Sequence, residues 1–184
     1  MDRELKQGTK ANISGKVLEQ VIIPMFNNFG YNVIQYNQVK KNPELEKEDK
    51  IVIFNIPFIS IYNHKGKTEY LIINKDGVKT RVEAKNQQCA GSVDEKLSYL
   101  FINTIYSYPE ENIILLIEGN GWKEGSKKWL ENAVKEYNEH FDKYKLHLQA
   151  LQPMFASNQP SIFKKKILVM NLSEFLAYFQ KNFA

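Results

Sequence analysis

The chain reads TEYLIINKDGVKTRVEAK at residues 68–85. From position 78 onward, charged side chains occupy the odd positions and small or apolar ones the even positions. This period of two is typical of a strand that packs one face and leaves the other polar. The letters KDG at 75–77 fit a three-residue hairpin turn that ends in a glycine of left-handed backbone conformation. The stretch therefore predicts two antiparallel strands in a defined register.

This register would bring two carboxylates together. If Asn74 pairs with Val78 across the turn, counting outward places Glu69 directly opposite Glu83. Like charges opposite one another destabilise a sheet, and a bound divalent cation is the simplest compensation. A two-residue turn would shift the register by one residue and separate the two acids.

The residue types around this pair indicate metal-assisted hydrolysis. Mg²⁺ binds oxygen ligands and often takes only one or two protein carboxylates, so Glu69, Glu83 and the Ala84 carbonyl oxygen would suffice, with Mn²⁺ as a substitute. Lys85 lies on the same strand face and could approach a bound phosphate or the attacking water. Gln88 follows closely enough to hold that water or a ligand. Together these groups predict hydrolysis of a phosphodiester; the alternative interpretation is an amphipathic hairpin with a solvated charged face.

Further predicted elements surround this hairpin. A helix is expected at 13–29, with a kink at Pro24 and an end at Gly30, followed by a solvated loop at 40–50. Strands are expected at 51–62, 68–74, 78–85, 113–117, 145–151 and 167–170, with a second three-residue turn, HKG, at 64–66. Other helices are expected from a capping box at 92–95 to Pro109, from position 126 and from position 173, with a long contact loop at 152–166. This order predicts an α/β fold, a three-layer sandwich with a central mixed sheet.

Composition excludes several classes of protein. The chain has 184 residues and a net charge of +4, which predicts one domain over 1–184 and mildly favours a polyanionic partner. Its single cysteine, Cys89, excludes a disulfide framework and a zinc quartet. Neither a signal peptide nor a membrane span is visible, so we expect a cytoplasmic protein with no membrane partner. Gly119 and Gly121 fit a tight strand-to-helix connection better than a dinucleotide turn, because the next glycine is one position late.

The order of these elements also resembles a known family. A helix, a three-strand meander that ends in Glu83-Ala84-Lys85, a second helix and a strand, over about residues 13–141, are similar to the PD-(D/E)XK nuclease superfamily with its restriction-endonuclease-like core. The sequences VEAKNQQCAGSVDEKLSYL at 82–100 and IILLIEGNGWKEGSKKWL at 113–130 look like small bacterial and phage nucleases and restriction enzymes of that superfamily. The chain is also similar in size to the small catalytic subunits of heterodimeric Type IIS restriction endonucleases.

The resemblance implies roles for individual residues. Glu83 and Lys85 match the second acid and the lysine of the family motif, and Glu69 matches the first acid, which is an aspartate in most members. In several branches of the superfamily an acid on the first helix joins the site, and Glu19 occupies that place. The alternative interpretation is that Glu19 is only a flank residue of an amphipathic helix. Gln88 matches the glutamine that some branches carry just after the lysine.

Lysines outside this motif are the candidate DNA contacts. They lie on one predicted helix and in the long loop, at Lys127, Lys128, Lys135, Lys164, Lys165 and Lys166. Such side chains bind phosphates and carry no sequence code, and a solvated helix face is the alternative. Base specificity would then come from loops, a homodimer or a larger recognition subunit.

These observations combine into one hypothesis. The sequence predicts a Mg²⁺-dependent endodeoxyribonuclease that uses Glu69, Glu83, Lys85 and Gln88. The resemblance implies that it acts in a restriction or phage system. The alternatives are a non-catalytic DNA-binding or assembly subunit with the same fold and a structure-selective junction resolvase. One catalytic centre cuts one strand, so a double-strand break would need a second copy or another subunit.

Overall fold

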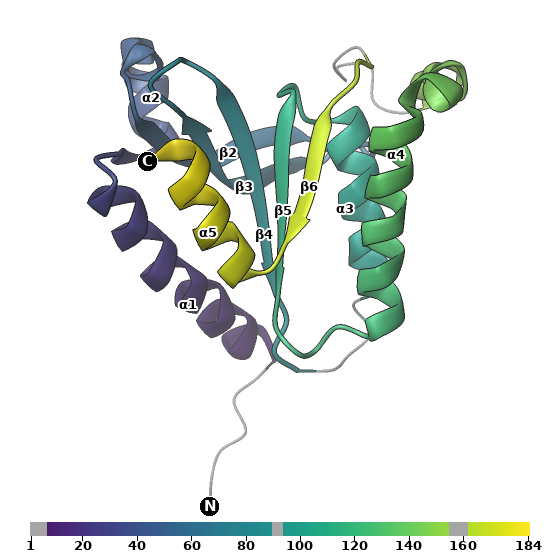
Figure 1. Cartoon of the computed structure of the whole chain (residues 1–184), viewed down its shortest axis with the longest axis horizontal. Helices are drawn as coiled ribbons and strands as arrows, with labels where there is room; N and C mark the ends of the chain where they lie inside the picture. The colour runs from purple at the N-terminus through teal and green to yellow at the C-terminus, as the bar shows by residue number, and fades with distance from the viewer. Residues whose placement is uncertain (1–6, 90–93, 155–161) are drawn as a thin grey trace, which may run out of the picture.

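A six-stranded mixed sheet organises the chain (Figure 1). The computed structural model describes residues 7–89, 94–154 and 162–184. The strands lie across the sheet in sequence order: β1 (Asn32–Gln35), β2 (Ile51–Ile59), β3 (Lys65–Ile73), β4 (Lys79–Asn86), β5 (Asn112–Glu118) and β6 (Lys166–Met170). The β2–β3–β4 meander is antiparallel, whereas β1 is parallel to β2, and β4, β5 and β6 are parallel to one another.

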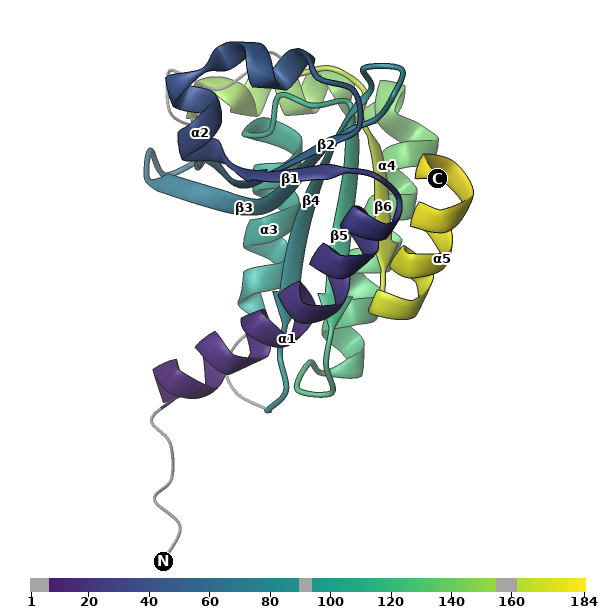
Figure 2. The same cartoon turned by 90° about the vertical axis from the view of Figure 1, so that its left-hand side faces the viewer.

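Helices cover both faces of this sheet. In Figure 1, α1 (Gln7–Asn28) and α5 (Leu172–Phe183) lie on one face, while α3 (Glu95–Tyr106) and α4 (Glu124–Leu151) lie on the other. The short α2 (Tyr36–Lys41) contacts β1 and β2 (Figure 2), and two 3-10 turns, η1 (Pro43–Lys47) and η2 (Gln152–Met154), complete the described elements. The expected three-layer α/β sandwich is confirmed.

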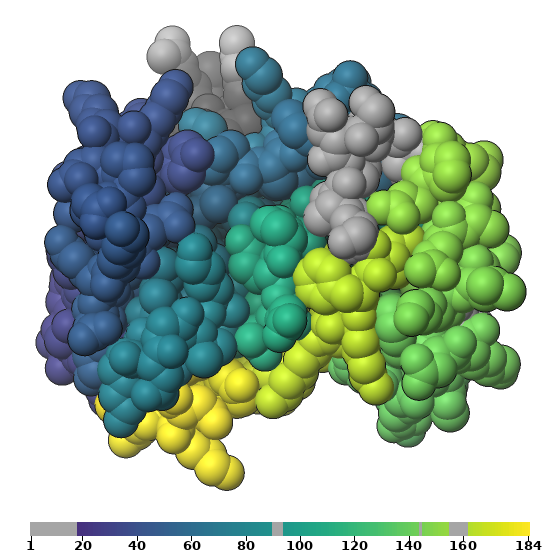
Figure 3. All heavy atoms as spheres, turned by 90° about the horizontal axis from the view of Figure 1, so that it is seen from above, coloured from purple at the N-terminus to yellow at the C-terminus, as the bar shows by residue number. Residues whose placement is uncertain are grey.

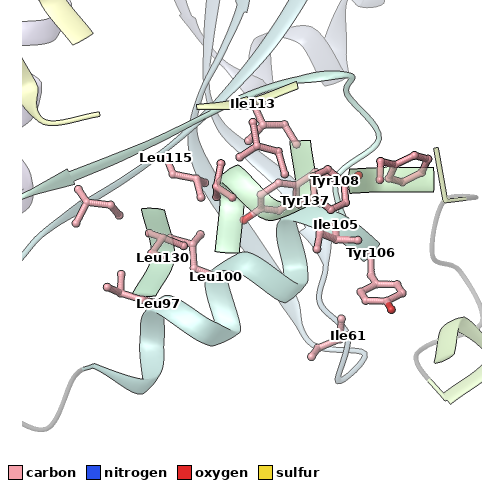
Figure 4. Close-up of a cluster of buried hydrophobic side chains, with 14 of the residues drawn as sticks. Ile61, Leu97, Leu100, Ile105, Tyr106, Tyr108, Ile113, Leu115, Leu130 and Tyr137 are labelled. Carbon is pink, nitrogen blue, oxygen red and sulfur yellow. The ribbon is translucent and has the colours of Figure 1, made fainter. Parts of the chain in front are cut away.

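The pleat of β5 divides the apolar core in two. Its residues alternate between the faces, with Ile114 and Leu116 packed toward α1 and α5 and Ile113, Leu115 and Ile117 packed toward α3 and α4. Figure 4 shows the second of these cores, in which side chains of α3 and α4 meet those of the sheet. A continuous apolar run is therefore explained by burial on both sides of the strand, as expected for 113–117.

On the opposite face, α1 and α5 meet through aromatic rings. Leu18, Ile22 and Phe26 of α1 recur every four residues, and they pack with Phe175 and Phe179 of α5. The α1 helix begins earlier than expected and continues through position 24. This packing places α1 against β4, the strand that carries the acid and lysine motif.

Several local expectations are wrong. The β2–β3 turn runs from Ser60 to His64 with Asn63 in left-handed conformation (φ 59°), and Gly66 instead lies inside β3 opposite Phe58. Residues 145–151 are helical and belong to α4, because Leu148 and Leu151 pack on the α3 and α4 core. The 40–50 segment is largely exposed but contains η1, and neither β1 nor α2 was expected. Positions 92–93 of the capping box and 155–161 of the long loop lie outside the described residues.

The glycines after β5 permit a close approach between two loops. The Gly121 N–H donates to the Gln87 carbonyl oxygen over 2.7 Å. A Cβ atom at Gly119 would lie 2.2 Å from that same oxygen, and one at Gly121 would lie 2.4 Å from the carbonyl oxygen of Cys89. The tight strand-to-helix connection is confirmed, and it supports the segment that follows β4.

Among the described helices, none is both long and apolar enough to cross a membrane.

Candidate active site

The β3–β4 hairpin has the register that the sequence predicts. The Asn74 N–H donates to the Val78 carbonyl oxygen, and Gly77 takes the left-handed conformation with φ 73°. The ladder then runs from Ile73 opposite Lys79 to Tyr70 opposite Val82. The ladder ends there, and the same register continued by one residue would set Glu69 opposite Glu83. There the Glu69 carboxylate accepts a 2.8 Å hydrogen bond from the Ala84 N–H.

Lys85 joins the two acids. Its Nζ lies 2.5 Å from Glu83 Oε1 and 3.4 Å from Glu69 Oε1. The Glu83 side chain is only 5% exposed, whereas those of Lys85 and Glu69 are 35% and 33% exposed. The three groups therefore converge at a place that is buried on the Glu83 side and open to solvent on the other.

This environment changes the protonation of the acid and the amine. Burial first, and the nearby Glu69 charge second, raise the pKa of Glu83 to about 8 against the opposing effect of Lys85. Burial would lower the pKa of Lys85, but the Glu83 and Glu69 charges outweigh it and raise that pKa above its usual range. Above the pKa of Glu83, the two carboxylates therefore share one cation, the lysine ammonium.

The acids also suit a divalent metal ion. Glu83 Oε2 is buried and has no hydrogen-bond partner among the residues that the structure describes. An unpaired buried carboxylate oxygen beside a second carboxylate is an oxygen donor set of the kind that Mg²⁺ binds. Within the described ranges, no three His, Cys, Asp or Glu side chains are grouped closely enough to hold a metal. The remaining ligands would be carbonyl, water or phosphate oxygens.

Two other predicted site residues make no hydrogen bond or ion pair to this cluster among the described residues. Gln88 is exposed, and its Nε2 donates to Asn86 Oδ1 over 2.5 Å. Glu19 is exposed on α1, and the charges of Glu19 and Glu69 both raise the pKa of the buried Tyr70 phenol after burial itself. Both acids therefore act on the same phenol through their charge, although Glu19 makes no hydrogen bond to the cluster in the described part of the chain.

A buried polar layer that the sequence did not predict lies on the same face of β4. The Arg81 guanidinium binds the Glu110 carboxylate with two contacts of 2.5 and 2.8 Å, and it donates to Thr68 Oγ1 over 2.8 Å. Its centre lies 5.1 Å from the Tyr108 ring. The alternation along β4 predicts that Arg81 lies on its polar face. No local sequence pattern predicts that Glu110, 29 residues away, is its partner. These contacts join β4, two residues before Glu83, to β3 and to the segment after α3.

Some of the lysines predicted to contact DNA are exposed, whereas others donate hydrogen bonds within the protein. Lys165 does not agree with the prediction, because it is 1% exposed and its ammonium donates to the Thr104 and Tyr108 carbonyl oxygens. Burial lowers its pKa to about 7. Lys127 is half-buried and donates to the Gly119 carbonyl oxygen.

Four predicted contacts remain on the surface. They are Lys128, Lys135, Lys164 and Lys166. Figure 3 views the molecule from the end at which β4, β5 and β6 begin, where the segment leading into β6 lies beside α4.

Comparison with known proteins gives one match. A family model described as a PD-(D/E)XK nuclease superfamily domain matches residues 10–183. No curated protein and no solved structure matches the chain. The match spans the meander with Glu69, Glu83 and Lys85, and the mixed sheet with helices on both faces agrees with a restriction-endonuclease-like core.

Proposed function

Because the chain belongs to the PD-(D/E)XK nuclease superfamily, we propose that it is a Mg²⁺-dependent endodeoxyribonuclease. Members of this superfamily are typically nucleases and generally use divalent metal ions. The observation that carries the proposal is the convergence of Glu69, Glu83 and Lys85, with one buried Glu83 oxygen unpaired among the described residues. A buried carboxylate oxygen without a protein partner calls for an explanation, and a bound cation supplies one.

The acids would hold the cation. Glu69 and Glu83 supply carboxylate oxygens, and the carbonyl oxygen of Ala84 would complete the protein ligands. When bound, Mg²⁺ would lower the pKa of a water molecule and neutralise charge on the phosphate. Glu19 would contribute through water from α1, and Mn²⁺ would substitute for Mg²⁺ because it accepts the same oxygen donors.

Lys85 would position the reacting groups. Its ammonium already touches both acids, so it can exchange one of these contacts for a phosphate oxygen or the attacking water without leaving the cluster. Its raised pKa keeps it charged at neutral pH, which suits stabilisation of the extra negative charge in the transition state. Gln88, two residues beyond the strand, would orient the water.

The wider assignment draws on charge and on resemblance. Exposed Lys128, Lys164 and Lys166, together with Lys127, would contact DNA phosphates. A role in a restriction or phage system, and a small catalytic subunit of a Type IIS enzyme in particular, is supported by sequence resemblance. A homodimer or a larger recognition subunit would supply base specificity.

Plasmid cleavage tests the site. We expect the protein to nick supercoiled plasmid with Mg²⁺ and not with a chelator, and we expect Glu83→Gln and Lys85→Ala to lower the rate by at least about 100-fold. Lys79→Ala is the matched control, because Lys79 lies on the same strand in an exposed ion pair with Glu46. It should retain activity.

Two results would count against the proposal. Unchanged nicking by both active-site variants would refute the assignment of the site. No cutting by the wild-type protein on linear, supercoiled or branched DNA, even with candidate partner chains, would favour a non-catalytic subunit. Faster cutting of branched than of linear duplex would identify a structure-selective resolvase with the same chemistry.

A further inference from the structure

An exposed aromatic stack lies on the turn between β2 and β3. Tyr62 is 64% exposed, and its ring stacks on Tyr99 of α3 with centroids 5.4 Å apart and planes 19° from parallel. The His64 ring meets the Tyr62 ring edge-on with centroids 6.3 Å apart. Although Tyr99 covers one face of the ring, Tyr62 remains 64% exposed, so it keeps surface that a ligand could contact.

The turn holds Tyr62 in a fixed position. The Ile61 N–H donates to Asn103 Oδ1 on α3 over 3.0 Å, which ties the turn to the helix that carries Tyr99. Within the turn, the His64 N–H donates to Ser60 Oγ and the Asn63 N–H to the Ser60 carbonyl oxygen. An exposed ring that is held in place loses little entropy when a partner stacks on it.

Ring contacts connect the turn to the strand that carries the proposed active site. The guanidinium of Arg81, two residues before Glu83 on β4, lies 5.1 Å from the centre of the Tyr108 ring. The ring of Phe58, on the strand that leads into the turn, packs edge-on against Tyr108 with centroids 5.0 Å apart.

The residues that follow the turn are basic. Lys65 and Lys67 are exposed on β3, directly after His64. Exposed lysines beside an aromatic platform are the combination by which proteins bind single-stranded nucleic acid, because the ammonium groups meet phosphates while the rings meet bases.

We propose that the Tyr62–Tyr99 stack binds an unpaired nucleobase of the DNA next to the scissile phosphate. This inference rests on the proposed function, which supplies the phosphate-cleaving residues beside the stack. Bases in a duplex are stacked on one another, so only an unpaired base can place its face on Tyr62. The substrate would therefore carry a single-stranded segment, a flap or a frayed end at the site of cleavage.

Binding without cleavage separates this inference from the proposed function. With a chelator present, the full chain is titrated against a fluorescein-labelled single strand and against the matching duplex, and anisotropy is measured. We expect Tyr62→Ala to weaken single-strand binding roughly 5- to 100-fold and to change duplex binding less than about twofold. Tyr62→Phe should retain wild-type binding, because the ring face remains.

A control variant and a spectroscopic probe sharpen the test. Trp129→Ala removes an exposed aromatic side chain from α4 and should leave single-strand binding unchanged. A strand that contains 2-aminopurine should lose fluorescence on binding the wild-type chain and keep it on binding Tyr62→Ala. Thermal unfolding of each variant confirms that the exposed substitution leaves the fold intact.

The outcomes distinguish the two proposals. Three results would each overturn the base-stacking site. They are an equal loss of affinity for single strand and duplex in Tyr62→Ala, a failure of Tyr62→Phe to bind the single strand, and unchanged single-strand affinity in Tyr62→Ala. If the single-strand effect appears although the protein cuts no DNA, the stacking site stands and the proposed hydrolysis fails.

Discussion

At the scale of the single residue, the burial of Glu83 costs free energy that the fold does not require. Its side chain is 5% exposed, and its Oε2 has no hydrogen-bond partner within the described ranges. Leaving such a group unpaired costs on the order of 1–3 kcal/mol. That cost is explained if the oxygen is reserved for a ligand, since active sites commonly retain interactions that are unfavourable until the ligand binds.

We expect the affinity for a divalent cation to rise with pH up to about 8. Burial raises the pKa of Glu83 to about 8, so in the metal-free protein below that pH this acid keeps a proton that metal binding must release. The apparent dissociation constant should therefore fall by up to about tenfold per pH unit below the pKa and level off above it. Calorimetric titration with Mg²⁺ at several pH values measures this, and Glu83→Gln is the control. A pH-independent affinity in the wild-type chain would contradict the assignment of Glu83 as a ligand.

The sequence could predict this cluster because local chemistry positions it. The turn at 75–77 sets the register, and the alternating side chains of β4 put Glu83 and Lys85 on one face. Lys165 shows the limit of such reasoning. Three consecutive lysines look alike in sequence, and only the tertiary structure shows that the middle one is buried against the carbonyl oxygens of Thr104 in α3 and of Tyr108 after it.

At the scale of the element, the two hairpins show why one turn could be predicted and the other could not. In the β3–β4 turn, Gly77 is the left-handed residue and the pattern of its neighbours agrees. In the β2–β3 turn, Asn63 takes that conformation. A Cβ atom on Gly66 would lie 2.5 Å from the Phe58 ring, so this glycine serves packing inside a strand. A glycine in a sequence is compatible with a left-handed turn position and with a close-packed position inside a strand. Only the cross-strand contacts decide which of the two it occupies.

The loop between β5 and α4 gives a prediction at this scale. A Cβ atom at Gly121 would lie 2.4 Å from the carbonyl oxygen of Cys89, so Gly121→Ala must displace the segment that follows Lys85. We expect it to lower the free energy of unfolding by about 1–3 kcal/mol and to reduce the nicking rate. Urea unfolding and plasmid nicking measure the two effects.

Gly125 provides the matched control for this loop. It lies inside α4 with no atom within 4 Å of an added Cβ, so Gly125→Ala should raise the free energy of unfolding by about 0.5–1 kcal/mol and leave nicking unchanged. Equal stabilities of the two variants would show that the close approach of the loops has no energetic consequence.

At the scale of the whole molecule, contacts between distant segments complete what local patterns begin. The layers follow from periodicity, because each apolar face must be covered. The Arg81–Glu110 pair and the position of β1 beside β2 depend on segments far apart in sequence. β1 has only four residues, too few for a clear alternation, and it was not predicted. The same long-range packing brings α1, with Glu19, against β4.

The number of acid clusters predicts the order of the DNA products. Each chain contributes one cluster of Glu69, Glu83 and Lys85, and one such centre hydrolyses one strand at a time. Supercoiled plasmid should therefore become nicked before it becomes linear, and linear product should increase more steeply with protein concentration than nicked product does. Gel time courses over a concentration series measure both species.

Mixing with an inactive chain tests whether the second cut needs a second copy. If two chains act together, adding excess Glu83→Gln protein should form mixed pairs that nick the plasmid and do not linearise it, because only one centre of each pair is active. If linear product instead forms without a nicked intermediate while sedimentation shows a monomer, a single chain must cut both strands. That outcome would contradict the expectation that each of two copies cuts one strand.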